Sequence, residues 1–112
     1  MKHGKIYKRG CCSNPFPFSD LTGTKRRPAL VVSSLQGREV ILCQIASKNV
    51  RDEYAIRLVD TDFAEGSLIQ ESNIRPNKIF TADEDIILYK LGCLKKEKIT
   101  VVVDRIVSII MA

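Results

Sequence analysis

A basic tripeptide stands directly before a proline in the first quarter of the chain, and its residue types suit phosphate binding. Lys25, Arg26 and Arg27 precede Pro28, and the backbone of a residue before proline is held extended. A guanidinium group on such a segment can hold a phosphate through two parallel hydrogen bonds. A solvated charge run ahead of a strand is the alternative interpretation.

The segment that leads to this tripeptide is a long loop by composition. Residues 14–28 include Pro15, Pro17 and Gly23 as well as two phenylalanines. A loop of this length inside a compact domain is usually functional. We therefore expect the loop and its basic end to form part of a binding site.

The charge and composition of the chain favour a globular protein with an anionic partner. Eighteen Lys and Arg against thirteen Asp and Glu give a net charge of +5 and a pI near 9.2. Neutralising phosphates releases counterions, which favours RNA or DNA as the partner. With 45% apolar residues, the 112 residues predict a single domain over 1–112. No membrane-length apolar run and no signal peptide are seen, so we expect a cytoplasmic protein without a membrane partner.

Four cysteines raise the question of a disulfide or a zinc site, and their spacing argues against both. Cys11 and Cys12 are adjacent, whereas Cys43 and Cys93 stand alone in apolar stretches. No C-x-x-C pair is present. We therefore predict buried free thiols at Cys43 and Cys93.

Short β-branched segments supply the elements that must position these residues. Ala29–Leu35 and Glu39–Ile45 flank a glycine-containing turn and predict a hairpin. Tyr54–Val59 alternates between apolar and polar residues and predicts a third strand. The remaining expectations are a loop over 60–66, two short strand pieces within 67–80 around Ser72 and Asn73, and a strand over 86–91.

The carboxy-terminal segment predicts a helix. Between Lys95 and Met111, apolar residues fall at 99, 102, 103, 106, 107 and 110, which is one face of a helix. The segment is also too long for a typical strand. Many short strands followed by one helix indicate a small, strongly bent antiparallel sheet or barrel.

Three motifs resemble those of PemK/MazF-type toxins. The stretch PFPFSDLTGTKRRPALVVS over 15–33 is long and specific, and it is similar to the signature loop and strand of that family. ILCQIASK over 41–48 and NIRPNKIFT over 73–81 resemble two further motifs of the family. With KLGCL over 90–94 and the helix after it, the similarity runs from about residue 15 to the end.

The resemblance implies a mainly β fold with a C-terminal helix, the SH3-like barrel of the PemK/MazF toxin type, assembled as a homodimer. It implies the toxin of a type II toxin–antitoxin system, which cleaves single-stranded mRNA without a metal. The ribose 2′-hydroxyl attacks the adjacent phosphate and leaves a cyclic phosphate and a 5′-hydroxyl. A cognate antitoxin protein blocks the RNA-binding surface.

Such chemistry depends on positioning and charge stabilisation, and a chain with the lone histidine His3 is compatible with it. The acidic residues over 83–85 are interpreted as a solvated turn, not a metal site. No metal or other cofactor is expected.

The resemblance also implies roles for individual residues. Arg27 would stabilise charge on the phosphate in the transition state, and Arg75 would contact RNA and assist the leaving group. Ser47 is the third candidate catalytic residue. The remaining candidates for RNA binding are Lys25, Arg26, Lys48, Asn73 and Lys78. An ion pair between Arg75 and Glu71 or Asp85 at the surface is the alternative interpretation of that arginine.

Two departures from the family pattern concern catalysis. Ala46 stands where the family has a threonine, and Ser47 replaces its hydroxyl only if the strand end turns inward, because neighbouring strand residues point to opposite faces. Ser72 and Asn73 stand where an acidic residue often precedes the arginine. A relative that binds RNA or antitoxin without cleaving therefore remains an alternative.

A third departure lies upstream, where the family has an apolar strand. Here Gly10 is followed by Cys-Cys-Ser-Asn over 11–14, which predicts a poor strand and an unpaired barrel edge. A pair of compensating frame changes in the gene and ordinary divergence are the two hypotheses for its origin.

A second alternative is a toxin on the same barrel that poisons a protein such as DNA gyrase. The Arg-Arg-Pro motif favours RNA instead, and Ile109–Ala112 shows nothing distinctive for such a poison.

Overall fold

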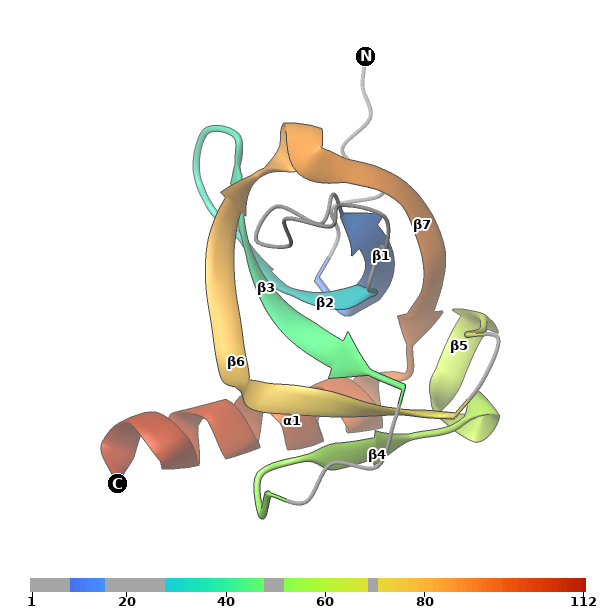
Figure 1. Cartoon of the computed structure of the whole chain (residues 1–112), viewed down its shortest axis with the longest axis vertical. Coiled ribbons are helices and arrows are strands. Elements are labelled where there is room, and N and C mark those ends of the chain that lie inside the picture. Colours follow the sequence, from blue (N-terminus) through green and yellow to red (C-terminus); the bar gives the residue numbers. More distant parts are fainter. Residues whose placement is uncertain (1–8, 16–27, 48–51, 69–70) are drawn as a thin grey trace.

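The described part of the chain is a curled antiparallel sheet of seven strands with one helix at its carboxy-terminal end (Figure 1). The computed structural model describes residues 9–15, 28–47, 52–68 and 71–112. The elements are β1 (Cys11–Pro15), β2 (Ala29–Ser34), β3 (Glu39–Ala46), β4 (Ile56–Leu58), the 3₁₀ turn η2 (Asp60–Asp62), β5 (Phe63–Gly66), β6 (Ser72–Asp83), the 3₁₀ turn η3 (Glu84–Ile86), β7 (Ile87–Leu94) and α1 (Lys96–Met111).

The strand order in the sheet is β4-β6-β3-β2-β1-β7-β5, and every neighbouring pair is antiparallel. In Figure 1 the sheet curls until β6 and β7 stand on opposite sides of the barrel, joined through η3 at its top. The helix α1 lies across the lower end. The predicted mainly β fold with a C-terminal helix is confirmed.

The core lies between the sheet and α1. Val102 and Ile106 of the helix are buried against Leu30, Ile45 and Ile74 from three adjacent strands. A smaller buried cluster, formed by Ala29, Val31, Val40 and Leu42, lies on the opposite face of β2 and β3. Both faces of β2 are therefore apolar. Burial on both faces explains why residues 29–32 form a continuous apolar run without alternation.

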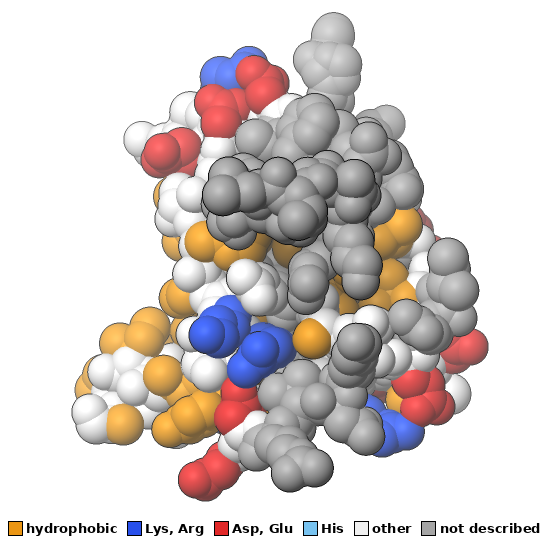
Figure 2. Space-filling view, viewed as in Figure 1, with side chains coloured by type: hydrophobic (Ala, Val, Ile, Leu, Met, Phe, Trp, Pro, Cys, Tyr) orange, Lys and Arg blue, Asp and Glu red, His pale blue; other side chains and the backbone are white. Residues whose placement is uncertain are grey.

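The helix is confirmed over Lys96–Met111, but its apolar stripe is only partly buried. Val107 is 51% exposed and Ile110 is 67% exposed, so the outer half of the predicted face meets solvent. Figure 2 shows this hydrophobic surface over the carboxy-terminal half of α1. Among the described residues, no helix has the length and apolar character needed to cross a membrane.

Two expectations for the strands were wrong. Residues 60–66 are not a loop, because β5 pairs with β7 through Phe63 opposite Leu94. The segment 67–80 does not hold two short pieces, because β6 is one strand that continues to Asp83. The strand β6 bends between Arg75 and Ile79 without interruption.

The expectation of a weak first strand was also wrong. Residues 11–15 form β1, which pairs with β2 on one side and β7 on the other, so this edge is not open. Cys12 is fully buried next to Leu30 and Cys43. Small apolar thiols fill this inner position without the branched side chains that strands usually prefer.

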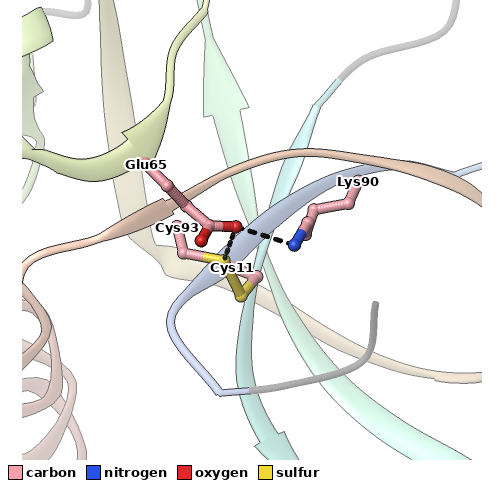
Figure 3. The surroundings of a disulfide bond; sticks show 4 residues. All are labelled: Cys11, Glu65, Lys90 and Cys93. Carbon is pink, nitrogen blue, oxygen red and sulfur yellow. Dashed lines mark hydrogen bonds and ion pairs between the residues drawn. A yellow bond between two sulfur atoms is a disulfide. The ribbon is translucent and has the colours of Figure 1, made fainter. Parts of the chain in front are cut away.

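The rejection of a disulfide is corrected in the same place. Cys11 is bonded to Cys93 across β1 and β7, and the two are direct register partners. Figure 3 shows Glu65 beside this bond, with one carboxylate oxygen 3.8 Å from the sulfur of Cys93 and 2.7 Å from the ammonium of Lys90. Cys43 is a buried free thiol as predicted, and Cys12 is another.

A glycine sets the distance between β1 and α1. Gly10 has a φ of +89°, and a Cβ there would lie 2.3 Å from the terminal methyl carbon of Ile99. Its backbone bonds both Val31 and Leu94, which fixes the entry to β1 between β2 and β7. Any larger residue at this position would be strained by the positive φ and would force the side chain of Ile99 to move.

Candidate functional site

The structure describes four of the predicted site residues. Ser47, Asn73, Arg75 and Lys78 are placed, and the rest lie outside the described residues: Lys25, Arg26, Arg27 and Lys48. The described four lie on β6 and at the end of β3, which are paired strands.

One face of the β3–β6 pair carries Asn73 and Arg75 together with Gln44 and Ala46. Gln44 is the register partner of Arg75, and Ala46 is the partner of Asn73. Partners across an antiparallel pair share a face, as do residues two apart in a strand. These four residues therefore form a compact square on one face, while Ile45 and Ile74 point to the core on the other.

The strand β4 extends this face by one basic residue. Arg57 is the register partner of Asn73, so Ala46, Asn73 and Arg57 lie in a row across three strands. The side chain of Arg57 is 70% exposed and bonds the carboxylate of Glu71. The alternating pattern of residues 54–59 predicts that Arg57 points outward, but it does not predict that Arg57 lies beside Asn73.

A bend in β6 projects the residues that follow Arg75. Cys43 pairs with Ile79 and Gln44 pairs with Arg75, so residues 76–78 have no partners on β3. Pro76 is buried in this bulge and has no N–H to leave unpaired. The exposed Asn77 and Lys78 follow it on the outside of the corner, which Figure 1 shows as the sharp turn of β6.

Arg75 is held by a carboxylate from another part of the chain. Its Nη2 donates to Oδ2 of Asp52 at 2.7 Å, and both side chains are about a quarter exposed, at 24% and 25%. The hydrogen bond from Arg75 is the main reason that the pKa of Asp52 lies below its usual 3.8, and the backbone N–H groups of Ala55 and Tyr54 lower it further, against partial desolvation.

Arg75 therefore does pair with an acidic residue, but with neither of the two expected. Glu71 bonds Arg57, and Asp85 bonds Arg38 at the far end of β6. Nε of Arg38 also lies 3.8 Å from Oδ1 of Asp83, so Asp83 and Asp85 both pair with this arginine. Within the described ranges, no three His, Cys, Asp or Glu side chains gather as metal ligands.

Ser47 lies outside the group formed by Gln44, Ala46, Asn73 and Arg75. It follows the last residue of β3 and is exposed, whereas Ala46 is the residue that faces Asn73. The position opposite Asn73 thus carries a methyl group. A hydroxyl can act here only if the backbone beyond β3 turns Ser47 back toward Arg75.

Sequence reasoning missed two residues of this surface, Asp52 and Arg57. Arg57 could have been found from the alternation of its strand, because it is the outward residue between buried Ile56 and Leu58. Asp52 gave no signal, since 23 positions separate it from Arg75 and only the fold brings them together. Figure 2 shows basic side chains over the bend of β6 with acidic ones directly below them.

Solved structures of other proteins have the same fold. An endoribonuclease in complex with its cognate antitoxin from a mycobacterial species superposes with a TM-score of 0.69 at 15% identity, covering 89% of this chain and 90% of that one. The Mycobacterium tuberculosis toxin MazF-mt6 superposes with a TM-score of 0.68 at 16% identity, covering 88% of this chain and 93% of that one. A further mycobacterial endoribonuclease superposes with a TM-score of 0.67 at 15% identity, covering 89% of this chain and 86% of that one. At these identities the similarity shows the fold.

The sequence itself shows the family. No curated protein matches the chain. The profile described as the PemK-like, MazF-like toxin of type II toxin-antitoxin systems matches residues 16–110, which is most of the chain. This protein therefore belongs to the family of PemK-like, MazF-like toxins of type II toxin–antitoxin systems.

Proposed function

We propose that this chain is an endoribonuclease toxin that cleaves single-stranded mRNA without a metal. Arg27 and Arg75 are the proposed catalytic cations: Arg27 stabilises charge on the phosphate, and Arg75 contacts RNA and assists the leaving group. The ribose 2′-hydroxyl attacks the adjacent phosphate, the 5′-oxygen leaves with a proton, and a cyclic phosphate remains.

The observation that carries this proposal is the polar face built from β3, β4 and β6. It places Arg57 beside Asn73 on the neighbouring strand and Arg75 two residues along β6, with Lys78 at the bend beyond Arg75. Cations and an amide spaced along one face suit a phosphodiester chain, because phosphate contacts supply most of the affinity for RNA. Related solved structures are described as endoribonucleases, which agrees with this chemistry.

The other proposed RNA contacts come from the amino-terminal loop and the end of β3. Lys25, Arg26 and Lys48 would hold the strand together with Asn73 and Lys78. Ser47 is the proposed source of the hydroxyl that the family threonine supplies.

A non-cleaving relative is the second candidate function, and one observation favours it. Ala46 occupies the position opposite Asn73, so the face beside Arg75 holds no hydroxyl from β3 itself. Such a protein would keep the cations and bind RNA or antitoxin without cutting.

The proposed protein partners are a cognate antitoxin and a second copy of the chain, in the cytoplasm. Val107, Ile110 and Met111 leave an apolar surface on α1 that suits a protein contact. One related structure is described as a complex with its cognate antitoxin.

Incubation of the purified protein with a mixed-sequence RNA and a chelator tests the activity. We expect cleavage by the unchanged protein and a loss of on the order of 100-fold or more in Arg27→Ala and Arg75→Ala, since each removes transition-state charge stabilisation. Arg38→Ala is the matched control, because it removes the same charge at the other end of β6. Intact RNA with retained binding would favour the non-cleaving relative.

A further inference from the structure

The turn over residues 52–55 is held from two sides by arginines. Within the turn, Oδ1 of Asp52 accepts the N–H groups of Tyr54 at 3.1 Å and Ala55 at 2.9 Å. On one side Oδ2 of Asp52 accepts a hydrogen bond from Nη2 of Arg75, which lies on β6. On the other side Nη1 of Arg105, from α1, donates to the carbonyl oxygens of Glu53 at 3.4 Å and Tyr54 at 3.1 Å.

The pair of Asp52 and Arg75 is more buried than the two other arginine–carboxylate pairs on β4, β6 and their neighbouring turns. The two side chains are about three-quarters buried, whereas the partners in the Arg57–Glu71 and Arg38–Asp85 pairs are 58–71% exposed. Exposed pairs are screened and hold their side chains weakly. Asp52 is also fixed by its backbone bonds, so it presents Oδ2 to Arg75 from one direction.

The guanidinium group of Arg75 is held through one nitrogen and not through its whole edge. Its Nε is buried and, among the described residues, has no acceptor. Oδ1 of Asp52 is occupied by the turn, so the carboxylate does not complete the two-bond contact that arginine makes with free carboxylates. The single bond from Nη2 thus orients the group, and the exposed quarter of the side chain remains open to a phosphate.

We propose that Asp52 is a positioning residue for Arg75, and that Arg105 acts with it by holding the turn that carries Asp52. This rests on the proposed ribonuclease function, in which Arg75 contacts RNA. The carboxylate fixes the orientation in which Arg75 meets the phosphate, so its loss slows the chemical step. Because Asp52 is negative, its loss does not weaken the binding of an anionic strand.

The two effects make a distinctive kinetic signature. Misplacing a reacting group by about 1 Å can cost on the order of 100-fold in rate. For Asp52→Asn we therefore expect kcat to fall by roughly 10- to 100-fold, while KM for RNA stays the same or decreases. A side chain that only stabilised the fold would lower the melting temperature and leave kcat of the folded fraction unchanged.

Four variants complete the experiment. Glu53→Gln is the matched control, because it removes the same charge from the next residue, which is exposed. Asp52→Glu restores a carboxylate and should recover part of kcat. Arg105→Ala should lower kcat in the same direction as Asp52→Asn, and Arg105→Lys should be intermediate. Asp52→Asn with unchanged or raised kcat would overturn the proposal while leaving the ribonuclease function intact.

A second measurement is independent of cleavage. We expect the Nε–H resonance of Arg75 in ¹⁵N NMR spectra to be sharp and slow to exchange with water, and to lose that protection in Asp52→Asn but not in Glu53→Gln. If the protein cut no RNA, the ribonuclease function would fail, and this comparison would still decide whether Asp52 positions Arg75. Equal exchange in all three proteins would contradict the positioning role.

Discussion

The thiol of Cys43 donates a hydrogen bond to the backbone carbonyl of Arg75, with 2.9 Å between Sγ and O. The bond spans the point at which β6 leaves its register with β3, since Cys43 pairs with Ile79 and Gln44 with Arg75. A fully buried thiol thus supports the backbone of the residue proposed to contact RNA.

Burial raises the pKa of both Cys43 and Cys12 to about 12, from an ordinary value of 9.0. Because the unfolded chain releases these protons first, their contribution to stability is complete below pH 9 and is lost as the pH rises toward 12. We expect the free energy of unfolding to fall from pH 8.5 to 10.5, measured by urea titration. Cys43→Ala should flatten this decrease, and an unchanged slope in that variant would contradict the assignment.

The thiol count tests the disulfide between Cys11 and Cys93. In denaturant without reductant we expect two reactive thiols, from Cys12 and Cys43, and four after reduction. The measurement is a colorimetric thiol titration of the purified chain under both conditions. Four thiols before reduction would show that the bond is not formed in the preparation.

The same bond should stabilise the fold, because it joins residues 82 positions apart. Closing a loop of this length constrains the unfolded chain and typically contributes about 2–4 kcal/mol. The double variant Cys11→Ser and Cys93→Ser should lose about that much in urea unfolding. Its control is the unchanged protein in reductant, which should lose a similar amount.

Two isoleucines of β6 that differ in burial test which face of this strand packs in the core. Ile74 is fully buried between the sheet and α1, so Ile74→Ala should lower the free energy of unfolding by about 2–5 kcal/mol. Ile79 lies on the same strand and is 42% exposed, so Ile79→Ala should cost much less. Equal losses in chemical denaturation would contradict the described faces of β6.

Lys78 offers a test of RNA binding without catalysis. It is exposed at the corner of β6, so Lys78→Ala should weaken RNA binding and leave kcat unchanged. Losing one phosphate contact to a single strand should reduce the slope of log affinity against log salt by about 0.7. Lys96→Ala, at the start of α1, is the control and should leave the slope unchanged.

The hairpin of β2 and β3 and the helix α1 were predicted from the sequence because their signals are local. Residues 29–34 and 39–46 are β-branched runs about a turn, and residues 96–111 have helical periodicity. The long strand β6 was not recognised, because Ser72 and Asn73 were interpreted as a break between two short strands, whereas β6 begins at Ser72 and continues to Asp83.

What the sequence could not predict depends on long-range register. Cys11 meets Cys93 because β1 lies between β2 and β7, and the spacing of the cysteines carries no trace of that order. The pairing of Asp52 with Arg75 is of the same kind. A family resemblance predicted Arg75 and Asn73 as site residues, and the strand register places both on one face with Arg57.

The ends of the RNA fragments test the central claim most directly. The protein should be incubated with a defined single-stranded RNA and a chelator, and the products analysed by mass spectrometry. Attack by the ribose hydroxyl predicts a cyclic phosphate on one fragment and a 5′-hydroxyl on the other, with no cleavage when the attacking 2′-hydroxyl is replaced by hydrogen. Fragments with 5′-phosphates, or cleavage at the 2′-deoxy site, would contradict the account.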